Sequence, residues 1–114
     1  LGILGEKCAG VSIIKLGFKI IEMNYLVPKI GEIDIIHMEN NELVFSEVKT
    51  IYNPSKLDNP ASRITPKKAE KLMAVSRMYL DEKGFGGDIR FDVISVRFFG
   101  NNPYISRIKN GISL

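Results

Sequence analysis

The sequence has few of the features that mark secreted or membrane proteins. Cys8 is its only cysteine, which excludes an internal disulfide and a zinc site built on cysteines. No apolar run approaches the roughly 18 residues of a membrane span, and the first residues show no basic-then-apolar signal pattern. We therefore expect a protein of the reducing cytoplasm that has no membrane partner.

The chain also lacks internal repeats, low-complexity tracts and any visible domain boundary. Its 114 residues fit one domain with one core, and we expect a single domain over residues 1–114. Hydrophobic residues make up 45% and charged residues 25%, both ordinary for a globular protein. The net charge of +3 and the pI near 9.0 permit a polyanionic partner without requiring one.

Helix and strand signals follow one another in an order typical of an α/β fold. Gly17 marks the end of a first helix, and Thr65 followed by Pro66 marks the start of a second. Apolar residues at helical spacing predict a buried stripe on each helix. We expect helices over residues 4–16 and 65–82, strands over 18–25, 33–38, 43–48, 89–98 and 104–109, and a long polar connection over 51–65.

The order of these elements predicts the architecture. The third and fourth strands are joined through a helix, so we expect them to be parallel, with a right-handed crossover. Two hairpins supply antiparallel pairs. A mixed sheet of about five strands with a helix on each face follows. The expected stripes are Ala9, Ile13 and Leu16, with Glu6 one turn earlier, and Ala69, Leu72, Met73, Ser76 and Leu80.

The hairpin over residues 33–48 brings charged residues together. Asn40-Asn41 suits a tight turn because asparagine tolerates positive φ, and residues paired across that turn have numbers that sum to 81. Alternation then places the four charged residues on one face at the open end of the hairpin, and the same face is apolar nearer the turn. A slip of one residue would separate the charges. The charged face holds Glu32, Asp34, Glu47 and Lys49, and the opposite face holds Ile33, Ile35, Val44 and Val48.

The predicted opposition of Asp34 and Glu47 is costly for a sheet. Two carboxylates at about 5 Å repel by roughly 3 kcal/mol at an effective dielectric near 20. With Glu32 and Lys49 the cluster has a formal charge of −2, which a hard divalent cation, Mg²⁺ or Mn²⁺, would neutralise. Lys49 would orient a metal-bound water or meet charge on a phosphate oxygen. The alternative is a solvated sheet end in which Glu32 and Lys49 form a surface ion pair.

These residues lie within a longer pattern that resembles a known family. The pattern resembles the restriction-endonuclease-like superfamily, also called the PD-(D/E)xK nucleases, and within it the bacterial YraN-like family. The frame of acids and lysine is also similar to archaeal Holliday-junction resolvases. The matching pieces are Gly5-Glu6-x-x-Ala9, Leu16-Gly17-Phe18, Gly31-Glu32-Ile33-Asp34-Ile35-Ile36, Val44-Phe45-Ser46-Glu47-Val48-Lys49-Thr50, Lys68 with Leu72, Tyr79-Leu80 and Arg90-Phe91-Asp92-Val93-Ile94.

The resemblance implies a three-layer αβα fold. It also implies that Asp34 and Glu47 are metal ligands, that Lys49 is the catalytic lysine and that Glu6 is a further acidic member of the site. Ile33 stands where the superfamily's name has proline.

Other residues receive secondary roles in this interpretation. Glu32 is expected either to support the metal ligands from behind or to serve as an alternative ligand, and an ion pair with Lys49 is the equal alternative. Lys68, Lys71 and Arg63 are candidates for contacts to a nucleic-acid backbone. His37 is expected to pack rather than to ligate. Arg90 and Asp92 are expected to form a structural pair, and Met73 and Met78 are read as packing residues.

The leading functional hypothesis is a metal-dependent nuclease whose partner is nucleic acid, with branched or damaged DNA as the candidate substrate. A second hypothesis is a nucleic-acid-binding module without catalysis. A third is a protein-interaction factor with a residual acidic pocket. A homodimer is compatible with each, with the final strand or the second helix as candidate contacts.

Overall fold

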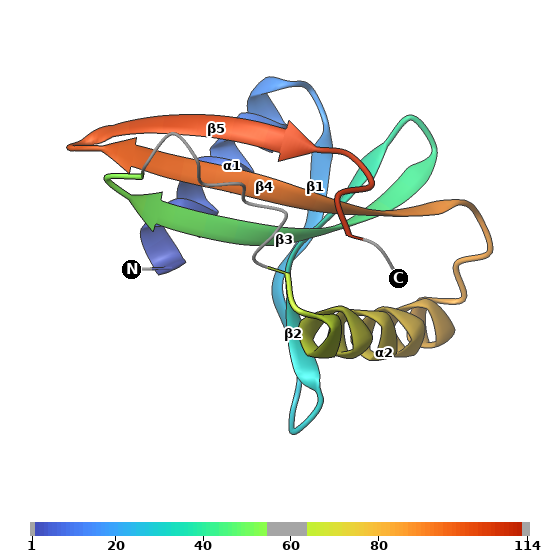
Figure 1. The fold of residues 1–114 in the computed structure, drawn as a ribbon. Coiled ribbons are helices and arrows are strands. Elements are labelled where there is room, and N and C mark those ends of the chain that lie inside the picture. Colours follow the sequence, from blue (N-terminus) through green and yellow to red (C-terminus); the bar gives the residue numbers. More distant parts are fainter. Residues whose placement is uncertain (1, 55–63, 113–114) are drawn as a thin grey trace.

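The computed structural model describes residues 2–54 and 64–112 and has a mixed α/β fold (Figure 1). Its five-stranded sheet has the order β1-β2-β3-β4-β5. Only β3 and β4 are parallel, and every other neighbouring pair is antiparallel. The elements are α1 (Gly2–Lys15), β1 (Lys19–Val27), β2 (Gly31–Glu39), β3 (Glu42–Tyr52), α2 (Pro66–Lys83), β4 (Ile89–Phe99) and β5 (Asn102–Ile108).

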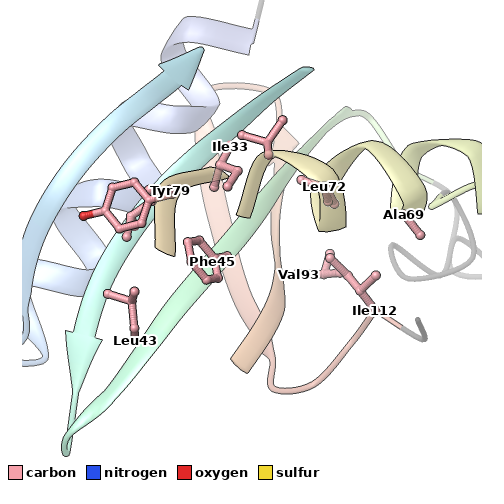
Figure 2. Packing of buried hydrophobic residues seen from close by; sticks show 10 residues of the cluster. Ile33, Leu43, Phe45, Ala69, Leu72, Tyr79, Val93 and Ile112 are labelled. Atoms are coloured by element: carbon pink, nitrogen blue, oxygen red, sulfur yellow. The ribbon is translucent and has the colours of Figure 1, made fainter. Parts of the chain in front are cut away.

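The two helices cover opposite faces of the sheet. The two separate clusters of buried apolar residues show this, since each contains residues of one helix. On one face Ala9 and Ile13 of α1 pack against Ile35, Ile94 and neighbouring residues of β4. The other cluster joins α2 to β2, β3 and β4 (Figure 2). The predicted three-layer arrangement with a helix on each face is therefore confirmed. The α2-side cluster includes Ile33, Phe45, Leu72, Val75, Tyr79 and Val93.

The ends of α2 follow from local chemistry. The Thr65 hydroxyl accepts a hydrogen bond from the Lys68 N–H at 3.1 Å, and Pro66 occupies the first turn, where its missing N–H costs nothing. Gly84 closes the helix at a φ of 66°, a left-handed conformation that glycine adopts without steric cost. Neither α1 nor α2 has the combination of length and apolar character needed to cross a membrane.

The buried stripes differ in part from the prediction. In α2 the buried residues are Ala69, Leu72, Val75, Ser76 and Tyr79, so Val75 and Tyr79 join the stripe while Met73 and Leu80 are half-buried. The other two differences lie on the solvent side: Met78 is 42% exposed, and Leu16 is 54% exposed because α1 has already ended at Lys15.

The turn between β2 and β3 confirms the predicted register. Asn40 and Asn41 have φ values of 49° and 71°, as a two-residue turn with both central residues left-handed requires. Pairing runs from Glu39–Glu42 to Ile35–Ser46, so each pair sums to 81 as predicted.

Each of the five strands extends past at least one of its predicted bounds. β1 continues to Val27, and β3 continues to Tyr52 into the predicted connection because Tyr52 pairs with Phe98 of β4. The two rings stack with centroids 5.0 Å apart. β5 already begins at Asn102 and includes Pro103, which an edge strand tolerates because one side of its backbone needs no partner.

Candidate metal and catalytic site

The β2–β3 ladder stops one residue before Asp34, and the side chain of Asp34 takes over. The last backbone pair is Ile35–Ser46. Beyond it, Asp34 Oδ2 accepts a hydrogen bond from the Val48 N–H at 2.8 Å. The ladder therefore does not continue to the predicted pairs Asp34–Glu47 and Glu32–Lys49. The strands diverge there, and a carboxylate replaces a backbone carbonyl as the acceptor.

The same point breaks the alternation of β2. Ile33 packs in the α2-side cluster and Ile35 in the α1-side cluster, although residues two apart in a regular strand share a face. The prediction that both lie opposite the charged face was therefore wrong for one of them. The adjacent strand is irregular too: Asn24, between the pairs Met23–Ile35 and Tyr25–Ile33, has a φ of 54°. Such irregularities re-aim side chains and are common beside functional sites.

Three carboxylates converge at this irregularity. Oxygen atoms of Glu6 from α1 and of Glu32 and Asp34 from β2 all lie within 4.8 Å of one another. Gly5 permits this approach, because a Cβ at that position would collide with Thr50 Oγ1 of β3. The glycine thus lets the first turn of α1 lie against β3 and brings Glu6 to the end of the sheet.

The cluster is electrostatically unfavourable without a cation. Burial, reinforced by the charge of Glu47, raises the pKa of Asp34 from 3.8 to about 7. Burial and the charge of Glu32 likewise raise the pKa of Glu6, while a hydrogen bond with Asn24 partly opposes the shift. Among the residues that the structure describes, no lysine, arginine or histidine nitrogen lies within 4 Å of these three carboxylates.

Glu47 belongs to a different local arrangement, with lysines. Its Oε1 lies 2.6 Å from Lys68 Nζ of α2 and 3.9 Å from Lys49 Nζ of β3. Partial burial opposes protonation of Lys68, but the ion pair with Glu47 is stronger, and the pKa of Lys68 is raised. Burial and the charge of Lys68 lower the pKa of Lys49. The arrangement presents two ammonium groups beside one buried carboxylate.

A cavity of about 360 Å³ lies between the first turns of α2 and the diverging ends of β2 and β3. Carboxylates of the sheet line one side and lysines of the helix line the other. A ligand that contains both a cation and an anionic group matches such walls. The lining residues are Gly31, Glu32, Asp34, Glu47, Thr65, Lys67, Lys68, Lys71 and Leu72.

The structure brings together nearly all of the residues singled out from the sequence. Glu6, Glu32 and Asp34 form the carboxylate cluster, Glu47 and Lys49 lie beside it, and Lys68 and Lys71 line the cavity. Arg63 lies outside the described residues. Sequence reasoning missed Asn24, whose only signal is an asparagine inside an apolar strand, where a left-handed residue breaks the pleat.

A second charged cluster lies at the turn end of the same hairpin and is fully compensated. Glu39 pairs with Glu42 in the ladder, and Arg90 bridges them at 3.2 and 3.1 Å. Arg90 also binds Asp92 through two hydrogen bonds of 2.8 and 2.9 Å, the structural pair that was predicted. His37 is fully buried, with Nε2 3.1 Å from Glu39. Arg107 and Lys109 also pair with Glu39, so the acids at this end of the hairpin are balanced by the protein's own cations.

Comparisons with known proteins give a consistent result. The model of an uncharacterised protein family, UPF0102, matches residues 5–96, a range that includes the carboxylate cluster and the cavity lining. A UPF0102 protein of Clostridioides difficile is 41% identical over 96 residues, which cover 83% of this chain and 82% of the relative. One of Alkaliphilus metalliredigens is 38% identical over 111 residues, 96% and 95% of the two chains. One of Streptomyces griseus is 35% identical over 115 residues, 99% and 95% of the two chains.

Proposed function

The chain belongs to the uncharacterised protein family UPF0102, and from its site we propose that it is a metal-dependent phosphodiesterase acting on nucleic acid. The proposal includes membership of the restriction-endonuclease-like superfamily, which the three-layer arrangement and the Asp34, Glu47 and Lys49 pattern support. Branched or damaged DNA is the proposed substrate.

The contrast between the two ends of the β2–β3 hairpin is the observation on which the proposal rests. At the turn end, Arg90 pairs with Glu39 and Glu42, and Arg107 and Lys109 also pair with Glu39. At the open end, Glu6 and Asp34 have raised pKa values and lie beside Glu32 with no protein cation within 4 Å among the described residues. Carboxylates within about 5 Å repel by roughly 3 kcal/mol per pair at an effective dielectric near 20. A fold tolerates that repulsion where an external cation relieves it.

A hard divalent cation fits this donor set. The cluster offers only carboxylate oxygens. Mg²⁺ and Mn²⁺ prefer such oxygens to nitrogen or sulfur ligands. Asp34 would hold the ion with Glu6 and Glu32, and Glu47, which borders the same cavity, would complete the set once its contact with Lys68 is exchanged. When bound, such an ion activates a water and neutralises charge on a phosphate oxygen.

The lysines supply the complementary half of the site. Lys49 lies beside Glu47 with its side chain 19% exposed, so its ammonium acts in a partly desolvated place where a charge interaction is stronger than in water. Its proposed task is to meet the negative charge that grows on the phosphate in the transition state. Lys68 and Lys71 line the opposite wall of the cavity, and their proposed role is to bind the phosphates of the strand.

A cleavage screen tests the proposal. Single-stranded, duplex, flapped and four-way-junction DNA would be incubated with wild-type protein in Mg²⁺ or Mn²⁺, with Asp34→Asn as the matched inactive control. Cleavage by the wild type that the variant and EDTA both abolish is expected. Absence of cleavage on every substrate, together with retained nucleic-acid binding, would assign the protein to the non-catalytic binding modules.

A further inference from the structure

The β4–β5 hairpin has an open surface on the α2 side of the sheet, which we call the hairpin face. It surrounds a shallow hollow of about 480 Å³. Figure 1 shows that the turn of this hairpin lies at the end of the sheet away from α2, so the helix leaves this face uncovered. The lining residues are Arg97, Phe99, Asn102, Tyr104 and Ser106.

Two aromatic rings stand on the hairpin face. Phe99 is 46% exposed and Tyr104 is 62% exposed, and the rings meet edge to face with centroids 5.3 Å apart. Each ring supports the other, so their orientation is restrained although their surfaces face solvent. Arg97 is the partner of Tyr104 in the ladder. None of the residues that β4 and β5 place on this face is acidic, so no carboxylate of these two strands repels a phosphate, and the two exposed rings suit a ligand with flat, partly apolar faces.

The hairpin face is continuous with the candidate site along the sheet. Lys49 pairs with Ser95, and Ser95 pairs with Ser106, so Lys49 is in register with Ser106 of the hairpin face. Tyr104 lies on β5, two strands from β3. It is two residues from Ser106, the β5 residue level with Lys49. With strands about 4.8 Å apart and a rise of about 3.3 Å per residue, the backbone separation is about 12 Å. A strand that places one phosphate in the cavity therefore reaches these rings with a nearby nucleotide.

We propose that the hairpin face binds single-stranded nucleic acid, with bases stacked on Tyr104 and Phe99. The direction of the strand rests on the proposed function of the neighbouring site, whereas the exposure and mutual contact of the two rings do not depend on that function. Unpaired bases can offer their flat faces to aromatic side chains, but bases inside a duplex are already stacked on one another. The face therefore selects unpaired segments such as flaps, gaps and ends.

A tryptophan reporter tests the contact directly, because the sequence contains no tryptophan. In Tyr104→Trp the only indole lies on the hairpin face, and titration with an oligodeoxythymidylate should quench and shift its emission. The control is Tyr52→Trp: Tyr52 is similarly exposed, at 41%, but stacks on Phe98, whose side chain packs in the α1-side cluster. An unchanged emission at position 104 under saturating oligonucleotide would overturn the proposal.

Affinity provides the second measurement, made by fluorescence anisotropy in EDTA so that no cleavage occurs. Tyr104→Ala should bind the labelled oligodeoxythymidylate on the order of 10- to 100-fold more weakly, the scale of one base–aromatic stacking contact, while binding of a matched duplex changes little. Tyr52→Ala should retain wild-type affinity. Equal losses for single strand and duplex would contradict stacking.

The outcomes separate this inference from the proposed nuclease activity. Loss of single-strand binding in Tyr104→Ala supports the hairpin face even if the wild type cleaves nothing. Cleavage by wild type with normal oligonucleotide binding by Tyr104→Ala and Phe99→Ala removes the inference and leaves the nuclease proposal intact. β5 is an edge strand, so sedimentation of the same variants is informative: dissociation of a dimer without an effect on oligonucleotide binding would identify a contact between copies and overturn the inference.

Discussion

Asp34 is subject to two opposing influences on its charge. It accepts a hydrogen bond from the Val48 N–H just beyond the last backbone pair of β2 and β3, and it lies in a cluster of like charges. The hydrogen bond from Val48 favours the charged carboxylate, but burial and the charge of Glu47 dominate, and the pKa is raised to about 7. The residue is thus held in a state that a metal ion would relieve.

The first prediction concerns this residue and pH. A carboxyl whose pKa is raised by folding stabilises the folded state fully below its unfolded value of 3.8, and this contribution is lost as the pH rises through about 7. A rise from 3.8 to about 7 corresponds to about 4 kcal/mol of unfolding free energy. In EDTA, the free energy of unfolding of Asp34→Asn should therefore increase relative to that of wild type as the pH rises. The amide keeps an acceptor for the Val48 N–H but carries no charge.

Urea denaturation of both proteins across that pH range measures the difference. Mg²⁺ or Mn²⁺ should then stabilise the wild type by about 2.7 kcal/mol at a hundredfold excess over its dissociation constant, with no response in Asp34→Asn. Parallel pH profiles of the two proteins would show that the carboxylate is not under the repulsion described.

The second prediction separates Lys49 from the metal ligands. An ammonium that acts mainly in the transition state affects rate far more than binding. Lys49→Ala should keep the metal-induced rise in melting temperature and its nucleic-acid affinity in Ca²⁺, yet cleave about 10²–10³-fold more slowly, the scale of one preorganised electrostatic contact. Lys49→Arg should rescue poorly, since a planar fork does not replace a compact ammonium.

Single-turnover cleavage at saturating protein is the measurement, with Lys83→Ala at the other end of α2 as the control. Wild-type rates in Lys49→Ala would exclude the proposed role.

Individual residues of the site could be predicted because their spacing along strands limits where they lie. Strand spacing brought Asp34, Glu47 and Lys49 together, whereas Glu6 was assigned through the family resemblance, with its place on the predicted stripe of the first helix in agreement. Their contacts could not be predicted. Glu47, whose charge acts on Asp34, also contacts Lys68. The position of Lys68 depends on how α2 docks on the sheet, and local sequence periodicity does not contain that information.

At the scale of elements, the approach of α1 to β3 controls the geometry of the carboxylate cluster. Gly5 lies so close to Thr50 that a side chain cannot be added without displacement, whereas a Cβ at Gly10 would meet Ile20 and Met23 at an ordinary 3.5 Å. The two glycines occupy the same helix and are both buried. They form a matched pair for testing close approach against helix propensity.

The third prediction uses this pair. Gly5→Ala should lower the free energy of unfolding by about 1–3 kcal/mol, the usual cost of overpacking, and weaken the metal response because Glu6 moves with the helix. Gly10→Ala should be neutral or stabilise by up to about 1 kcal/mol, as expected when alanine replaces a helical glycine. Urea denaturation with and without Mn²⁺ gives both quantities. Equal effects of the two substitutions would mean that helix propensity alone is at work.

Element boundaries show where sequence reasoning ends. The Asn40-Asn41 turn fixed the register, since both residues adopt the left-handed conformation that asparagine accepts. The divergence at Asp34 was not predictable, because it depends on the pairing of β2 with an irregular β1 and on both helix layers. The extension of β3 to Tyr52 likewise depends on a partner strand that is distant in sequence.

At the scale of the whole molecule, the two ends of the sheet differ in how their charges are balanced. At one end of the sheet Arg90, Arg107 and Lys109 balance the acids, while at the other acids and lysines face each other across a cavity. The modest net charge of +3 conceals this separation, which is why composition alone permitted a polyanionic partner without identifying one.

The fourth prediction tests whether this polarity binds a phosphate backbone. Lys71 is exposed and lines the cavity, so Lys71→Ala should weaken binding to any DNA sequence by a similar factor. It should also lower the slope of log affinity against log salt by about one unit. Lys83, which lies 3.6 Å from Glu82 near the end of α2, is the control and should leave the slope unchanged. Affinities measured across a salt series give the slope, and an equal change in both variants would point to net charge rather than contact.

The replacement of a backbone acceptor by the Asp34 carboxylate has a spectroscopic consequence. The Val48 amide proton points at a titrating group rather than at a fixed carbonyl, so its NMR chemical shift should follow the ionisation of that group. A single backbone resonance, in the middle of an otherwise rigid sheet, would then register both pH and the arrival of a metal ion. The chemical shifts of residues in the regular part of the ladder, such as Val44, should not change with pH or metal. The Val48 resonance would therefore report whether the site holds a metal ion.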